Sequence, residues 1–449
     1  LSTYRTVQKY SLAKYYSNQR TKCLFSTRAF IEKIARHIWI SYWFIPALIL
    51  LISLCLAPLT LSLDHLLAGS VHADFVLLSK TQPASAQALL STIAGSIIGV
   101  AGVSFSITMV AVSFASGSFG PRLIGNFMRD RGNQTSLGVF IGSFIYTLLI
   151  LREVRSSDSV KYTDTSIAEF VPQLSISFSL FLAIVCMFFL IYFIHHVPET
   201  INIERIIARL GDALKDGVSK RFPKQDSEPK KISAIDQNWI EKADPKDAME
   251  IKYVSEGYIQ AIDISALQRI ADENELLIDL VKRPGAFVTN HSTVMHVWSE
   301  GECDTALKKA LGSCLATGDL RTINQNIEFV ADQLIEIIAR ALSPGVNDPF
   351  TAIACLNWLQ VGILAFADAD ADEDDASHTI GRVHATPLQF DEFVSAIFVK
   401  AVPYIRSDQN VMHHTQEMLS FMAENLKDDG HKSAINKATE TLGSRAHVD

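Results

Sequence analysis

The chain has 449 residues, of which 20% are charged and 48% are apolar, with a mean hydropathy of +0.19. This composition is too apolar for an ordinary soluble protein and too charged for one buried wholly in a membrane. Low-complexity disorder and a disulfide-stapled secreted domain are excluded, because the apolar content supports large cores and only six cysteines are present.

Charge divides the chain into two parts. From Leu1 to His195 there are 15 Lys and Arg against 8 Asp and Glu, whereas the remainder carries 25 basic and 40 acidic residues. The first part is therefore basic and apolar, and the second is acidic and polar. An acidic part argues against a nucleic-acid partner, since binding to phosphates needs a cationic surface.

Four segments of the first part are long and apolar enough to cross a bilayer, because ~20 helical residues cover the ~30 Å hydrocarbon layer. They are Ile38–Leu61, Ala88–Ser116, Thr135–Leu151 and Phe170–Ile194. The sequence thus predicts a basic N-terminal segment (1–37) followed by a four-helix transmembrane domain (38–195). Pro46 and Pro58 lie in the first span, which a membrane helix tolerates when neighbours satisfy the freed carbonyls.

Basic residues predict the direction of these spans. Eight Lys and Arg precede the first span, and Arg122, Arg129 and Arg131 follow the second. The positive-inside rule then places both termini and the acidic part in the cytoplasm. An organelle transit peptide is the alternative for the basic N-terminus. The three arginines are either topology anchors or ligands for lipid phosphates or the acidic domain.

Small side chains form a stripe on the second span, within an arc of about 80° at 100° per residue. The stripe consists of Ser91, Gly95, Gly99, Gly102, Ser106 and Ser113. It either lets another helix approach closely or, in several copies around an axis, lines a narrow uncharged pore. Gly138 and Gly142 in the third span predict helix packing only.

Two adjacent histidines, His195 and His196, end the fourth span. They are candidates for interface anchoring, or for binding a proton, a metal or a lipid head group. Neighbouring side chains on a helix point about 100° apart, so one ion held by both is not expected.

The second part predicts a cytoplasmic α+β region. A helix and linker (196–249) precede a small β-rich module (250–300) and a helical domain (301–449) that ends in a helical bundle. Amphipathic periodicity predicts helices over Ile323–Leu342 and Phe350–Phe366. The overall fold class is a mainly α membrane protein with a cytoplasmic α+β domain.

A turn motif joins those two helices and includes Ser343, Pro344, Gly345, Asn347 and Asp348. Its local explanation is that Gly345 relieves the turn, Asp348 caps the next helix and Pro349 opens it. The functional alternative is a ligand held at the helix N-terminus. No phosphate loop, zinc motif, calcium loop or nucleophile elbow is present in the sequence, so we expect no catalytic residue, metal or cofactor and no enzyme activity.

Several separated motifs resemble one bacterial family. They are Leu90-Ser-Thr-Ile-Ala-Gly-Ser, Val103-Ser-Phe-Ser-Ile-Thr, Ser118-Phe-Gly-Pro-Arg-Leu, Ile191-Tyr-Phe-Ile-His-His196 and Ala341-Leu-Ser-Pro-Gly-Val-Asn-Asp-Pro-Phe-Thr-Ala352. From Trp39 to the C-terminal helices the chain is similar to the membrane proteins called domain of unknown function 2254. The resemblance implies a multi-span bacterial inner-membrane protein with a cytoplasmic C-terminal region, and it implies no reaction.

Two functions follow from these observations. The first is a homo-oligomeric channel or pore for ions or small solutes, with the second span near the axis. The second is a non-conducting scaffold or regulator in the bilayer that recruits a cytoplasmic protein partner. The predicted spans lack charged side chains, which disfavours a proton-coupled transporter.

Overall fold

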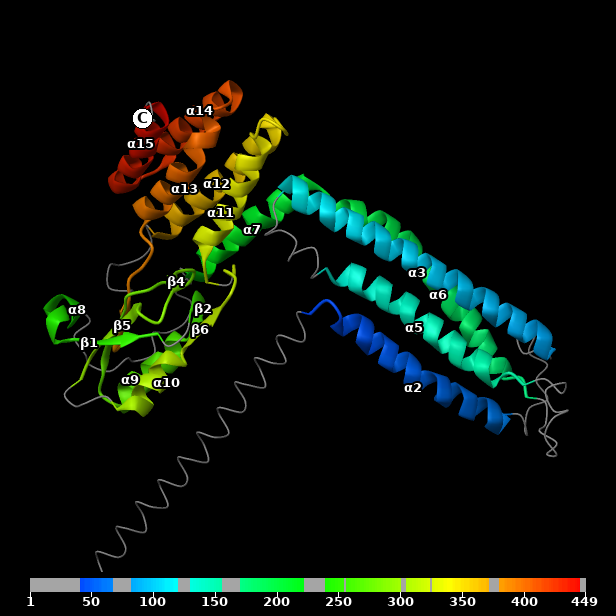
Figure 1. The fold of residues 1–449 in the computed structure, drawn as a ribbon. Helices are drawn as coiled ribbons and strands as arrows, with labels where there is room; N and C mark the ends of the chain where they lie inside the picture. The colour runs from blue at the N-terminus through cyan, green and yellow to red at the C-terminus, as the bar shows by residue number, and fades with distance from the viewer. Residues whose placement is uncertain are drawn as a thin grey trace, which may run out of the picture. The chain divides into compact units, whose positions relative to one another are not determined.

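The computed structural model describes residues 41–67, 82–119, 130–155, 170–221, 239–253, 256–299, 304–323, 325–370 and 379–444. The chain divides into two compact units, a first that ends at Ile201 and a second that begins at Asn202 (Figure 1). The fold is mostly helical with a small sheet region.

Each predicted span is a helix in the first unit, and each helix runs past at least one predicted end. The helices are α2 (Phe44–Leu67), α3 (Pro83–Phe119), α5 (Arg131–Glu153) and α6 (Gln173–Ile201). α5 starts four residues before the predicted span because the Asp130 carboxylate accepts a hydrogen bond from the backbone N–H of Asn133 and caps the helix. The third span is therefore 23 residues long, enough to cross a bilayer.

The four helices run alternately up and down (Figure 1). α2 and α5 run in the same direction, since Ile49 lies beside Gly138 and Thr60 bonds to Tyr146 further along both helices. α3 runs the opposite way, because Gln87 near its start bonds to Val154 just after the end of α5. One end of the bundle therefore holds the end of α2 and the start of α6. We call it the Asp64 end, and the opposite end the Asp130 end.

Two glycines of α5 allow a close contact with α2. A Cβ added at Gly138 would lie 2.6 Å from Ile49 Cδ1 and 3.1 Å from Pro46 Cα, and one at Gly142 would lie 2.7 Å from Ser53 Oγ. Small residues thus let the α2 backbone approach, as in other membrane helix pairs. The prediction that Gly138 and Gly142 serve packing is confirmed.

A fifth helix is also long and apolar enough to span a membrane. This helix, α12 (Pro349–Asp370), belongs to the second unit, whereas the sequence predicted four spans. It packs against α7, α11, α13 and α14 of that unit. Residues such as Leu356, Leu359 and Ile363 are fully buried there, so contact with several helices accounts for its apolar character.

Five more helices of the second unit pack into one bundle with α12. They are α7 (Ile203–Arg221), α11 (Ile327–Ala341), α13 (Phe390–Ile405), α14 (Gln409–Asn425) and α15 (Asp429–Gly443). α7 begins one residue after α6, where the Asn202 side chain accepts the backbone N–H of Glu204. Two glycines allow close approach of α7 and α12: Gly211 faces the Trp358 ring and Gly362 faces Leu214.

Two small sheets complete the unit. One has the strand order β1-β5-β3-β8-β7 and the other β4-β2-β6, with β3 and β8 parallel and the other pairs antiparallel. The strands are β1 (Met249–Lys252), β2 (Gly257–Ile262), β3 (Leu277–Leu280), β4 (Phe287–Val288), β5 (Thr293–Trp298), β6 (Leu315–Gly318), β7 (Thr379–Ile380) and β8 (Val383–Ala385). The short helices are α8 (Trp239–Lys242), the 3₁₀ turn Pro245–Asp247, α9 (Ile264–Glu273) and α10 (Thr305–Gly312). Strands β6, β7 and β8 lie after residue 300 in the sequence, so the two sheets extend past the β-rich module that the sequence predicted over residues 250–300.

Candidate functional site in the membrane unit

The small-residue stripe of α3 faces away from the other helices of its unit. All six members, Ser91, Gly95, Gly99, Gly102, Ser106 and Ser113, are exposed. The opposite face of α3 is buried and includes Leu90, Ile97, Ala101 and Ala111. A Cβ added at Gly95, Gly99 or Gly102 would meet no atom within 4 Å. The packing of α3 within the unit therefore does not use the stripe.

Two hydroxyl groups on or beside the stripe donate hydrogen bonds to carbonyls of their own helix. Ser106 Oγ donates to the carbonyl of Gly102 at 2.9 Å, and Thr92 Oγ1 donates to that of Ala88 at 2.8 Å. Such back-bonding satisfies the hydroxyl without a partner on another helix. The stripe is consequently a slender, uncharged surface that can lie in a membrane.

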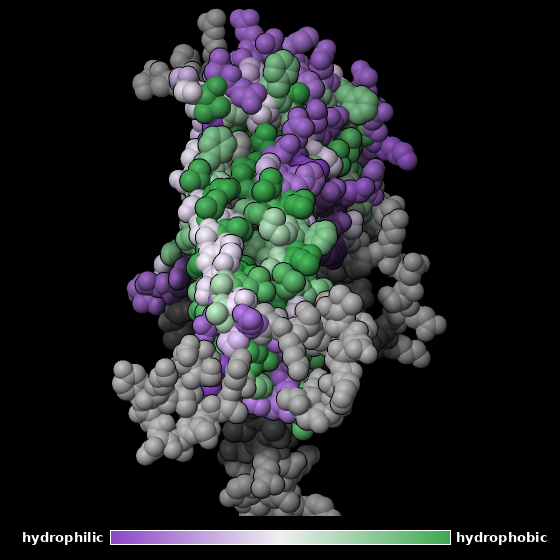
Figure 2. All heavy atoms as spheres, turned by 90° about the vertical axis from the view of Figure 1, so that its right-hand side faces the viewer, coloured by the Kyte–Doolittle hydropathy of each residue, from purple (hydrophilic) through white to green (hydrophobic). Residues whose placement is uncertain are grey.

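Large apolar side chains are exposed on the first-unit helices, among them Leu51 on α2, Val110 on α3 and Phe188 on α6. Figure 2 shows hydrophobic residues gathered in a broad patch across the middle of the visible face. A contiguous apolar surface of this kind marks contact with lipid or protein. Together with four long apolar helices, it supports a membrane location for the unit.

At the Asp64 end, a buried carboxylate caps a helix of the bundle. Asp64 on α2 is 8% exposed and accepts hydrogen bonds from Leu174 N at 2.9 Å, Ser175 N at 3.0 Å and Ser175 Oγ at 2.6 Å. These are the free backbone donors of the first turn of α6, where a negative charge is also favoured by the helix dipole. Asp64 thereby ties α2 to α6.

Sequence reasoning placed Asp64 in the loop after the first span and so missed this role. The signal that could have found it is its spacing from Thr60, one helical turn earlier. Thr60 Oγ1 lies 2.9 Å from the hydroxyl of Tyr146, which is fully buried on α5. The Asp64 end therefore joins α2, α5 and α6 through polar contacts.

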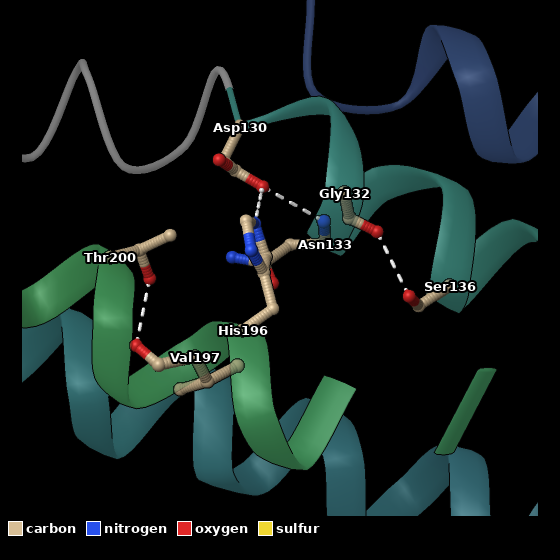
Figure 3. A network of polar contacts seen from close by, with 7 residues as sticks. All are labelled: Asp130, Gly132, Asn133, Ser136, His196, Val197 and Thr200. Carbon is tan, nitrogen blue, oxygen red and sulfur yellow. Dashed lines mark hydrogen bonds and ion pairs between the residues drawn. The ribbon is translucent and has the colours of Figure 1, made fainter. Parts of the chain in front are cut away.

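At the Asp130 end, a hydrogen bond between two side chains links α5 and α6. His196 Nε2 lies 2.8 Å from Asp130 Oδ1, and both side chains are mostly buried. Figure 3 shows the His196 ring pointing from α6 to the Asp130 carboxylate at the start of α5. The ring stacks on Tyr192 with centroids 4.9 Å apart, and Gly132 leaves room for both rings. The contact fixes the axial position of α6 relative to α5.

Asn133 lies beside that pair and is 3% exposed. Neither of its side-chain polar atoms has a hydrogen-bond partner among the residues that the structure describes. A cavity of about 10 Å³ next to it is also lined by Ser104 and Thr108 of α3. That volume is at the lower limit for one water molecule, so hydration is the simplest way to satisfy the amide.

The other predicted interface residues behave separately. His195 is 79% exposed and lies 3.6 Å from Glu199 Oε1, so the two histidines point to different partners. Arg131 is exposed at the first position of α5. Arg122 and Arg129 lie outside the described residues.

The turn from Ser343 to Asp348 has a local structural explanation. Asp348 Oδ1 accepts the backbone N–H of Thr351 at 3.2 Å, and Pro349 is the first residue of α12. The left-handed residue of the turn is Asn347, with φ of 49°, and not Gly345 as the sequence predicted. Asparagine tolerates this conformation better than most side chains do.

One titratable cluster lies on the five-stranded sheet. Asp279 is flanked by His296 Nδ1 at 3.9 Å and His384 Nε2 at 4.0 Å, distances too long for direct hydrogen bonds. Burial raises the pKa of Asp279, and the two histidines oppose that rise. Among the described residues, no group of three His, Cys, Asp or Glu side chains is arranged to hold a metal ion.

Comparisons with known proteins support the membrane assignment. Uncharacterised proteins of Mycobacterium bovis and Mycobacterium tuberculosis are 27% identical to this chain over 360 residues. The match covers 79% of this chain and 66% of each relative, slightly less than two thirds of their length. No solved structure matches the chain. The family model described as predicted membrane protein (DUF2254) matches residues 39–420, which cover most of both units, and the chain therefore belongs to that family.

Proposed function

We propose that the chain is a four-span bacterial inner-membrane protein that assembles from identical copies into a channel or pore for ions or small solutes. In this proposal, α3 lies near the axis of the assembly, and its stripe faces the α3 helices of the neighbouring copies. The second unit and both termini lie in the cytoplasm, as the excess of Lys and Arg before the first span indicates.

The single observation that carries this proposal is the outward direction of the stripe. Three glycines and three serines lie along one face of a 37-residue helix, and that face is exposed. In a bilayer, small side chains make few van der Waals contacts with lipid tails. A second helix, by contrast, packs closely against such a face and makes many more. Several copies meeting through it would surround a narrow, uncharged path.

The span number rests on the surroundings of α12. Its neighbours α7, α11, α13 and α14 cover it within the second unit, so it has no need of lipid to bury its apolar side chains. α2, α3 and α6 instead carry exposed apolar side chains along their length, and α5 packs against α2 and α6. An even number of crossings also agrees with the basic residues on one side of the membrane.

A non-conducting scaffold is the second candidate. It is favoured by exposed apolar side chains on the second unit, among them Leu320, Phe350 and Val399. Exposed residues of this kind on a unit with excess acidic charge suit a cytoplasmic partner protein.

Two measurements on the full chain distinguish the candidates. The first is the mass of the purified protein in nanodiscs, and the second is ion flux from liposomes that contain it. A channel predicts an oligomer and flux above that of empty liposomes, and both should change in Gly99→Leu. A monomer without flux would refute the channel and leave the scaffold.

A further inference from the structure

An apolar cavity of about 270 Å³ lies in the first unit between α3 and α6. Its floor consists of Ile93 and Ile97 of α3, Phe140 of α5 and Cys186 of α6, all of them buried. These four residues belong to one apolar cluster. The floor is therefore part of the packed core of the bundle, and the atoms it presents to a bound molecule are carbon and sulfur.

The rim of the cavity is exposed. Ile184 and Met187 of α6 are 51% and 55% exposed, and Thr92 and Ser96 of α3 are exposed on the other side. The Thr92 hydroxyl already donates to the Ala88 carbonyl. The cavity thus opens away from the bundle and has almost no free polar group on its surface.

Water is a poor occupant of this space. A buried water makes about three hydrogen bonds, and apolar cavities of about half this volume stay dry and accept apolar ligands. An empty cavity would also lose the dispersion contacts of its lining. The lining therefore favours an apolar ligand over water or an empty cavity.

The surroundings identify the kind of ligand. Every residue that lines the cavity lies on α3, α5 or α6, three of the helices that are long and apolar enough to span a membrane. The medium at the opening is then the hydrocarbon layer. We propose that this cavity is a binding site for one hydrocarbon chain of a membrane lipid, held between α3 and α6 above Phe140.

The site is separate from the stripe. Thr92 and Ser96 are positioned on the flank of α3 between its stripe and its buried face. The proposal needs the membrane location of the first unit, which the family supports, and it does not need a channel. A side chain from a second copy is the competing occupant.

Native mass spectrometry of the full chain, purified in mild detergent and given phosphatidylglycerol with oleoyl chains, tests the site. We expect one lipid per chain to be retained at detergent concentrations that remove the other lipids. Ala183→Phe places a ring in the cavity and should weaken that retention by about tenfold or more. Leu180→Phe places the same ring at an exposed position of α6 outside the cavity and should retain the lipid.

A second variant separates loss of lipid binding from loss of the fold. Ser96→Leu fills the cavity from its exposed rim without changing the floor, and it should reduce retention while the unfolding temperature stays at the wild-type value. A lipid that carries a diazirine on its chain should also label α3 and α6 near the cavity in the wild type, and less in Ser96→Leu.

Two results would overturn the proposal. One is equal lipid retention by the wild type and both cavity variants. The other is a fall in oligomer mass in these variants with lipid retention unchanged, because that would assign the cavity to a neighbouring copy.

Discussion

Two helices of the membrane unit carry glycines at helical spacing, and their surroundings are opposite. On α5, Gly138 and Gly142 lie against Ile49 and Ser53 of α2, with no room for a Cβ. On α3, Gly99 has no atom within 4 Å of the same position. A small-residue pattern therefore specifies a surface that accepts a close helix, but it does not specify whether that helix belongs to the same chain.

The difference extends to the polar contacts. Asp64 and Tyr146 fasten α2, α5 and α6 to one another, and Asp130 and His196 fasten α5 to α6 again at the other end. α3 is joined to the end of α5 by a hydrogen bond from the Gln87 side chain to the carbonyl of Val154. The positions of α2, α5 and α6 are thus defined by contacts within the chain, while the small-residue stripe of α3 faces away from these helices.

The largest effect is expected at the glycine contact between α5 and α2. Gly138→Leu would drive a side chain into Ile49 and the Pro46 backbone. Because the backbone cannot move aside cheaply, we expect a loss of about 3 kcal/mol or more in the free energy of unfolding. Thermal unfolding in detergent measures this loss. An unchanged unfolding temperature would mean that α2 and α5 do not pack as described.

A smaller loss is expected when the cap of α6 is removed. Asp64→Ala leaves the first backbone donors of α6 buried without an acceptor, which should cost about 2 kcal/mol. Asp64→Asn keeps one acceptor oxygen and should fall between this variant and the wild type. Equal stability of all three proteins would show that water or lipid head groups replace the carboxylate.

The sheet cluster offers a pH-dependent effect away from both glycine surfaces. The raised pKa of Asp279 means that the folded state holds this proton more tightly than the unfolded state does. Stability from this group is therefore present at low pH and is lost as pH rises through the raised pKa. Asp279→Asn should gain about 1 kcal/mol over the wild type at pH 8, with the gain shrinking toward pH 4.

Unfolding of the full chain at several pH values tests that prediction. The oligomer mass of Asp279→Asn should equal that of the wild type, because the residue lies in the second unit. A gain that grows as pH falls would contradict the sign of the effect.

The smallest effect on stability is expected on the outer face of α3. Gly99→Leu adds a side chain where the described residues place no atom within 4 Å, so the unfolding free energy of one chain should change by less than about 0.5 kcal/mol. The oligomer mass should fall, whereas Ile98→Phe, at an exposed position beside the stripe, should leave it unchanged. A large loss of stability in Gly99→Leu without any change in mass would reverse the comparison with Gly138.

Hydropathy predicted the membrane helices because apolar length is a local property. It misjudged their ends, since these depend on single capping contacts such as Asp130 with Asn133. Asp64 was assigned to a loop because an acidic residue next to an apolar run is usually exposed, and only the arrival of Ser175 makes its burial favourable.

Long-range pairing set the other limit. Strand β8 pairs with β3 although Val383 and Ile278 are far apart in the sequence. Local sequence patterns do not predict which distant strand a given strand pairs with. The stripe was found from residue spacing alone, whereas the direction it faces needed the positions of α5 and α6. The lipid cavity also arises from three helices together and leaves no motif in any one of them.

Cysteine cross-linking in native membranes tests the central claim most directly. In a background without the native cysteines, Gly99→Cys should form a disulfide between two copies, whereas Leu51→Cys on the exposed face of α2 should not. Cross-linking of Gly99→Cys no stronger than that of Leu51→Cys would show that the stripe faces lipid and would contradict an assembly built on α3.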